Sequence, residues 1–153
     1  MLTGRHIVVG VSGGVAAYKA AYLCRRLIEQ GATVKVVMTG SAGQFVGPAT
    51  FAAITGTHPV VDLFNDPDVS PHTTLARWAD AVVIAPATAS TIAKICSGDS
   101  SNALVATVLA TTRPVLIAPA MVANIALDQT CPFVLLVYFA SHRIEREESG
   151  IPA

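Results

Sequence analysis

Short apolar runs without a polar residue at every second position recur along the chain and predict buried strands. The first is HIVVGV at residues 6–11, which is rich in β-branched residues. This pattern is typical of a strand covered by helices on both faces. Similar runs follow at residues 32–38, 81–87 and 114–120, and the shorter run PVVDLF at residues 59–64 is a candidate for another strand.

Segments with helical spacing separate these runs. After the turn SGG, apolar residues recur at Ala16, Ala20, Leu23 and Leu27, and Gly31 supplies a stop. Strands that alternate with helices imply parallel βαβ units with right-handed crossovers. The pattern therefore predicts an α/β fold, a three-layer sandwich with a parallel sheet. Further helices are expected at residues 47–56, 72–79, 88–98 and 102–112.

Length and composition favour one domain that associates with other subunits. A chain of 153 residues is long enough to bury a core without disulfides or metal, and we expect a single domain over residues 1–153. Hydrophobic residues make up 52% and charged residues only 13%, so much of the surface is expected to contact another subunit. No apolar run reaches membrane-spanning length, and FVLLVYF at residues 133–139 is strand-length. A soluble protein without a membrane partner is expected.

Charge and cysteine usage argue against several classes of protein. Ten basic and ten acidic residues balance, and the longest basic cluster is the pair Arg25 and Arg26, so nucleic acid is not an expected partner. Cys24, Cys96 and Cys131 are widely spaced and form no CxxC pair. Neither a disulfide framework nor a metal site is indicated, which favours the cytoplasm.

Two loops after predicted strands carry groups that can bind phosphate. In an open parallel sheet, ligands bind beyond the carboxyl ends of the strands. The loop GVSGG at residues 10–14 matches neither the dinucleotide fingerprint nor the P-loop. It is either a tight turn with Ser12 as a helix cap or a set of backbone N–H donors for phosphate. Thr39 and Ser41 follow the second predicted strand and are either turn formers or hydroxyl donors.

Two later loops and one histidine are further candidates. The sequence APA occurs at residues 85–87 and again at 118–120, and Thr88 and Ser90 follow the first. These Ala-Pro corners are either tight strand exits or one wall of a slot for a flat ring such as a flavin. His72 lies in the turn-rich segment SPHTTLARW and is either a surface residue or an acid–base group.

Taken together, these loops resemble the homo-oligomeric flavin-containing cysteine decarboxylases, in particular the phosphopantothenoylcysteine decarboxylase domain of coenzyme A biosynthesis. The resemblance spans about residues 5–121 and is carried by four segments. It implies a flavodoxin-like Rossmann fold, FMN bound at the subunit contacts of a homotrimer, and further assembly into dodecamers. The segments are GVSGGVAAYK, TGSAGQFVGPATFAAITG, PHTTLARWADAVVIAPATASTIAKICSG and LATTRPVLIAPAM.

The resemblance also implies roles for individual residues. His72 corresponds to the catalytic histidine, which acts as acid and base at the flavin of a neighbouring subunit, and Met121 and Asn124 are expected at the substrate. The implied reaction oxidises the cysteine thiol of the substrate to a thioaldehyde, releases carbon dioxide and reduces the resulting enethiol to 4'-phosphopantetheine. The residues expected at FMN are Ser12, Gly13, Thr39, Ser41, Ala87, Thr88 and Ser90.

The chain departs from the family pattern after residue 121. Val122 stands where the family has an Asn that holds the substrate carboxylate, and Asn124 comes two residues later. The family's clamp cysteine would follow Ala153, where the sequence stops. Three alternatives stay open: a decarboxylase of another C-terminal cysteine substrate, a catalytically impaired FMN-binding subunit or regulator, and a flavodoxin-like electron carrier.

Overall fold

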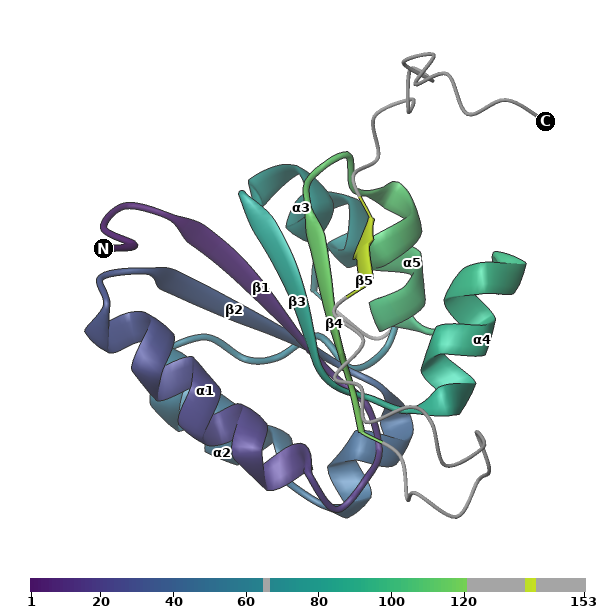
Figure 1. The fold of residues 1–153 in the computed structure, drawn as a ribbon, viewed down its shortest axis with the longest axis horizontal. Coiled ribbons are helices and arrows are strands. Elements are labelled where there is room, and N and C mark those ends of the chain that lie inside the picture. The colour runs from purple at the N-terminus through teal and green to yellow at the C-terminus, as the bar shows by residue number, and fades with distance from the viewer. Residues whose placement is uncertain (65–66, 121–136, 140–153) are drawn as a thin grey trace, which may run out of the picture.

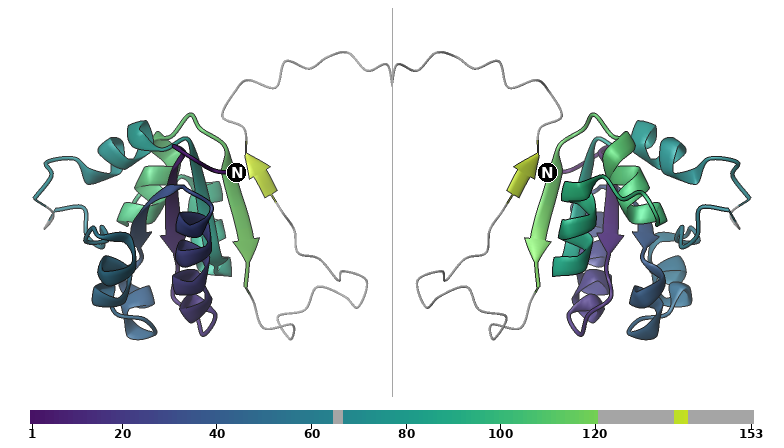
Figure 2. Two further views of the ribbon diagram at one scale, coloured as in Figure 1. Left: turned by 90° about the vertical axis from the view of Figure 1, so that its left-hand side faces the viewer. Right: turned by 90° about the vertical axis from the view of Figure 1, so that its right-hand side faces the viewer.

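The protein is described by a computed structural model, which covers residues 1–64, 67–120 and 137–139. Its sheet has the strand order β2-β1-β3-β4-β5. The first four strands are parallel, and β5 pairs with β4 in the antiparallel direction, as the opposed arrowheads in Figure 2 show. The strands are β1 (His6–Val11), β2 (Thr33–Met38), β3 (Ala81–Ala87), β4 (Val115–Pro119) and β5 (Val137–Phe139).

Helices cover both faces of the sheet. In Figure 1, α1 and α2 lie on one side of the strands, and α3, α4 and α5 lie on the other. The predicted α/β sandwich of three layers is therefore confirmed; the antiparallel edge strand is an addition to the expected parallel sheet. The helices are α1 (Ala17–Glu29), α2 (Pro48–Thr55), α3 (Pro71–Trp78), α4 (Ala89–Ser97) and α5 (Ala103–Ala110), and a 3-10 helix, η1 (Gly40–Gln44), follows β2.

Successive side chains of β1 pack into two separate halves of the core. Val8 packs with Ile84 and Leu104 on the side of α3 and α5, whereas Val9 packs with Phe51 on the side of α1 and α2. All five of these side chains are fully buried, and full burial of one such side chain stabilises the fold by about 1.5–3 kcal/mol. A strand that is buried on both faces explains why its sequence lacks alternation.

The candidate strand at residues 59–64 is wrong. Val60 makes only an isolated parallel bridge to Val37 of β2. Pro59 has no N–H to donate to a ladder, and the backbone N–H of Phe64 donates to the Asp62 carboxylate at 2.9 Å. This local turn directs the chain away from β2 after one bridge.

The helices α2 and α4 end at the glycines that the sequence predicts as stops. Gly98 has φ 72° and ends α4, and Gly56 has φ 73° and ends α2, because glycine adopts the left-handed conformation without steric cost. None of the helices in the described ranges is long and apolar enough to cross a bilayer.

Candidate functional site

The parallel strands bring four loops to one edge of the sheet. Ser12, Thr39, Thr88 and Ala120 each follow the carboxyl end of one of the strands β1 to β4, at the lower edge of the sheet in Figure 1. β2 lies on one side of β1, and β3, the next strand in the sequence, lies on the other side. The strand order therefore reverses between β1 and β3, which is where open α/β sheets bind ligands.

Ser12 follows β1, which lies between β2 and β3, and is fully buried. Its hydroxyl donates to the carbonyl oxygen of Pro86 at 2.7 Å and accepts from the backbone N–H of Thr88 at 2.9 Å. The N-cap of α1 is Ala16, which makes no side-chain cap bond. The interpretation of Ser12 as a helix cap is therefore wrong, because its hydroxyl is engaged with β3 across the sheet.

The loops after β1 and β2 touch each other. A Cβ atom at Gly13 would lie 2.4 Å from Ser41 Oγ and 2.8 Å from the Ser41 carbonyl carbon. Both distances are shorter than Cβ contacts in real proteins, so the close approach requires glycine. The hydroxyl groups of Thr39 and Ser41 are 3.0 Å apart. We call residues 13–15 and 39–41 the cradle.

The cradle presents several free backbone donors. The N–H groups of Gly13, Gly14, Val15, Gly40 and Ser41 make no hydrogen bond within the described part of the chain. Successive unpaired N–H groups ahead of a helix bind anions well. With the two hydroxyl groups beside them, the donor set fits a phosphate monoester, and a side chain at residue 13 would fill the space where the two loops meet.

The first Ala-Pro corner leads directly into α4 beside the cradle. Ala87 is fully buried, and its carbonyl oxygen accepts from the N–H of Ala120 at 2.9 Å, which joins the two corners. Thr88 is the N-cap of α4, and its Oγ1 accepts from the N–H of Thr91 at 3.4 Å. Ser90 lies exposed in the first turn. The residues predicted to border a ring thus lie together at the start of α4, where a Cβ atom at Gly14 of the cradle would lie 3.6 Å from the methyl carbon of Thr88.

An apolar pocket of about 290 Å³ lies between α1 and the two corners. Among the described residues that line it, only Lys19 is charged, and its side chain is exposed. Lys19 was not predicted as a site residue, because the helical pattern groups it with polar residues on the solvent-facing side of α1. The spacing of Ala16, Lys19, Ala20 and Leu23 is the signal that could have identified it, since residues three, four and seven apart share a helix face.

His72 lies on α3, and this helix contributes none of the cradle donors. It is the second residue of α3, and no hydrogen bond joins it to the cradle among the described residues. Its side chain is half-buried, and its Nδ1 is buried without a hydrogen-bond partner within the described ranges. The other two predicted substrate residues, Met121 and Asn124, lie outside the described residues.

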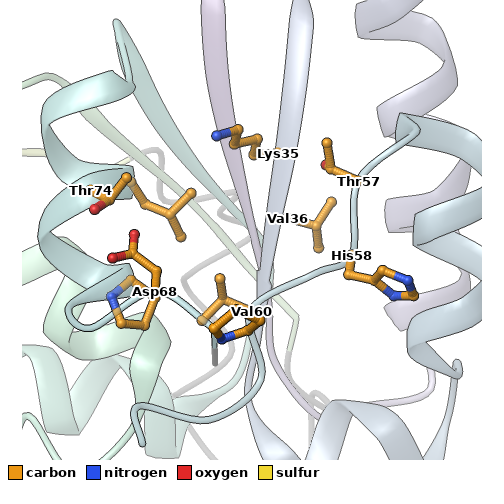
Figure 3. Close-up of a pocket in the computed structure, with 10 residues that line it drawn as sticks. Lys35, Val36, Thr57, His58, Val60, Asp68 and Thr74 are labelled. Carbon is orange, nitrogen blue, oxygen red and sulfur yellow. The ribbon is translucent and has the colours of Figure 1, made fainter. Parts of the chain in front are cut away.

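A second pocket of about 280 Å³ lies between β2 and α3 (Figure 3). Lys35, His58 and Asp68 contribute its titratable groups. Hydrogen bonds from the Thr74 side chain and the Ser70 backbone lower the pKa of the Asp68 carboxyl. The Lys35 ammonium also lies 4.7 Å from the ring centroid of Trp78. No cradle residue lines this pocket.

The described cysteines and acidic residues suggest no other chemistry. Burial raises the pKa of the Cys24 thiol to about 12, so this core thiol stays protonated and is not nucleophilic at neutral pH. Cys96 is exposed on α4, and Cys131 lies outside the described residues. In the ranges that the structure covers, no three His, Cys, Asp or Glu side chains gather as a metal site would require.

Comparison with known proteins assigns the family. The sequence model described as Flavoprotein matches residues 1–130. The chain belongs to the flavoprotein family. Its expected fold is confirmed by a crystal structure of the FMN-dependent cysteine decarboxylase SpaF, which is 34% identical with a TM-score of 0.76 and aligns over 88% of this chain and 77% of that one. A PPC decarboxylase variant complexed with pantothenoylaminoethenethiol is 32% identical with a TM-score of 0.65, over 78% and 68% of the two chains.

Sequence relatives of this flavoprotein are larger proteins. The coenzyme A biosynthesis bifunctional protein CoaBC of Vibrio cholerae is 50% identical over 123 residues, which are 78% of this chain and 31% of that protein. CoaBC of Bacillus subtilis is 46% identical over 123 residues, which are 79% and 30% of the two chains. The chain therefore spans about a third of the length of the curated relatives that it matches.

Proposed function

We propose that this flavoprotein binds FMN and decarboxylates 4'-phosphopantothenoylcysteine to 4'-phosphopantetheine, in the cytoplasm. The observation that carries the proposal is the cradle, in which Gly13 and Ser41 meet with free N–H donors around them, next to a wall of small residues at Ala87 and Ala120. This combination suits a phosphate joined to a flat ring. Relatives named as CoaBC and as PPC decarboxylase support the choice of substrate.

Each part of the site has a separate task in this proposal. The cradle donates hydrogen bonds to the FMN phosphate, and Thr88 and Ser90 border the ring at the start of α4. FMN held there would supply two-electron redox chemistry, and because the electrons taken from the substrate would be returned to it, the net reaction would release only carbon dioxide. The two Ala-Pro corners, in which Pro86 and Ala87 are buried, would exclude water from the reacting carbon and sulfur atoms. His72 takes a proton from the substrate thiol and later returns a proton to the product.

We further propose that the active form is a homotrimer that assembles into dodecamers. His72 lies on α3, and the described residues show no hydrogen bond between it and the cradle of its own chain. A neighbouring copy that supplied His72 would complete the site. That residues 1–153 form a single domain also stays a prediction, as does the direct role of Met121 and Asn124.

Lys19 is expected to bind the anionic substrate at the rim of the apolar pocket. Replacement of Lys19 by Gln should raise KM about tenfold with a smaller effect on kcat, because the substrate loses one charge-assisted contact. Steady-state kinetics at low salt would measure this. Arg25→Gln is the matched control, since it removes the same charge from α1 at a residue outside the pocket. Equal KM values for the two variants would contradict the role of Lys19.

A catalytically impaired FMN-binding subunit is the second candidate function. Val122 favours it, because this side chain cannot donate a hydrogen bond to a carboxylate as the family's Asn does. Such a subunit would bind FMN but would turn over only with a partner chain that supplies the missing groups.

Anaerobic addition of phosphopantothenoylcysteine to the purified protein separates the two candidates. Flavin absorbance near the visible maximum and released carbon dioxide are followed together. A catalyst releases carbon dioxide and forms the saturated thiol. An impaired subunit keeps its flavin band unchanged and releases none, and a preparation without any flavin would refute both.

A further inference from the structure

We propose that Ser12 is a positioning residue that sets the start of α4 against the cradle without contacting the cofactor. The inference rests on the FMN site proposed above and assigns Ser12 a different task from the direct cofactor contact that the sequence predicted. It follows from an irregularity in the sheet between β1 and β3.

β3 carries one extra residue at its carboxyl end. The β1–β3 ladder runs in register up to the pair Gly10 and Ile84. On the other side of β3, Ile84 pairs with Ile117 and Ala87 pairs with Pro119, so three steps along β3 match two steps along β4. Such a bulge leaves backbone groups without their regular ladder partners.

Ser12 supplies the missing partners with its side chain. In a parallel ladder, the N–H of a residue donates to the carbonyl before its partner, and its own carbonyl accepts from the N–H after that partner. The N–H of Ser12 donates to Pro86 O at 3.2 Å, as if Ala87 were its partner. The N–H of Thr88, however, donates to Ser12 Oγ at 2.9 Å. The hydroxyl therefore stands in for a backbone carbonyl and donates its own hydrogen to Pro86 O at 2.7 Å.

This arrangement leaves Ser12 no donor for a ligand. Its N–H and its O–H are both used within the chain, and the side chain is fully buried. Thr88, which it holds, is the N-cap of α4. Ser12 thus couples the loop that carries the phosphate donors to the helix start that borders the ring, across 76 residues of sequence.

Hydrogen exchange of the flavin-free protein tests the contact itself. In the Ser12→Ala variant, the amide of Thr88 should exchange at least about tenfold faster than in the wild type, since it loses its acceptor. Amides of α5, such as Val105 and Thr107, should be unchanged. Unchanged exchange at Thr88 would overturn the proposal, whether or not the protein binds FMN or decarboxylates.

Titration with two flavins separates a positioning residue from a phosphate ligand. Riboflavin lacks the phosphate of FMN. Ser12→Ala should raise Kd for FMN and for riboflavin by a similar factor, about tenfold, because the ring wall moves. Ser41→Ala, which removes a cradle hydroxyl, should raise Kd for FMN only. A Ser12→Ala variant weakened for FMN but not for riboflavin would show that Ser12 binds the phosphate, and would refute its positioning role.

If Ser12→Ala folds poorly, a pair of substitutions at Thr88 tests the same hydrogen bond from its donor side. Proline and alanine at residue 88 both remove the N-cap hydroxyl, but only proline also removes the N–H that Ser12 accepts. The φ of Thr88, −78°, suits proline. With Ser12 retained, Thr88→Pro should weaken riboflavin binding more than Thr88→Ala does, because only proline removes the N–H that donates to Ser12 Oγ. Equal weakening by the two substitutions would contradict the coupling.

Discussion

Asparagine in place of His72 should abolish carbon dioxide release while FMN stays bound. The expected loss in rate is about 10²–10⁴-fold, which is the usual contribution of a positioned acid–base group. His72 lies on α3, and no cradle donor comes from that helix, so flavin affinity should not change. Stopped-flow measurement of carbon dioxide release, with flavin absorbance recorded on the same samples, checks both parts of the result.

His58→Asn is the matched control for this experiment. His58 is exposed and lines the pocket between β2 and α3, and its replacement should leave the rate and the flavin content unchanged. A His72→Asn variant with the wild-type rate would remove His72 from the mechanism. Loss of FMN in that variant would show instead that His72 supports the cofactor site.

Mixed oligomers test whether His72 serves a neighbouring copy. A His72→Asn chain keeps its cradle, and a chain with a closed cradle keeps its histidine, so each variant alone should be inactive. Co-expressed in equal amounts, they should recover about a quarter of the wild-type activity, because a quarter of the randomly formed contacts in a cyclic oligomer combine both intact groups. No recovery would show that His72 and the cradle act within one chain.

Alanine in place of Gly13 should close the cradle and lower FMN affinity by about 100-fold or more. Its methyl group would lie 2.4 Å from Ser41 Oγ and 2.8 Å from backbone carbon. The side chain of Ser41 can rotate away, but the backbone cannot, so the two loops must separate and their N–H donors no longer converge on one phosphate. Flavin content after purification and the Kd for FMN measure the effect.

Gly43→Ala provides the control in the same region. A methyl group at Gly43 would have no heavy atom of the described residues within 4 Å beyond its chain neighbours, and FMN affinity should be unchanged. Ser41→Gly in the Gly13→Ala background should restore binding only in part, because the backbone contact remains. Wild-type affinity in Gly13→Ala would show that the phosphate binds elsewhere.

Most of the fold could be predicted from the local pattern. β1 appears where a run of β-branched residues lacks alternation, and α4 ends at the expected glycine, Gly98. The error at residues 59–64 arose because PVVDLF has the composition of a strand. The segment pairs with β2 at a single bridge, because the Asp62 carboxylate accepts from the Phe64 N–H and turns the chain. The antiparallel pairing of β5 with β4 is a contact between separate segments that no local signal specifies.

The candidate site could be predicted as a set of loops but not as a set of contacts. Parallel strands place their carboxyl ends at one edge, so the positions of Thr39, Ser41, Thr88 and Ser90 near one another were foreseeable. The task of Ser12 was not, because it depends on a one-residue bulge in β3 that shifts Thr88 toward its hydroxyl. Lys19 was missed because the pocket that it borders forms only when α1 packs on the corners.

The chain's own residue order was sufficient for the element types, the alternation of strands and helices, and the edge where a ligand binds, because these depend on periodicity and on chirality shared by all L-residues. The close contact of Gly13 with Ser41 and the use of the Ser12 hydroxyl as a ladder group are different. They depend on distances between residues far apart in the chain, and packing of the whole sheet sets those distances to within a fraction of an ångström.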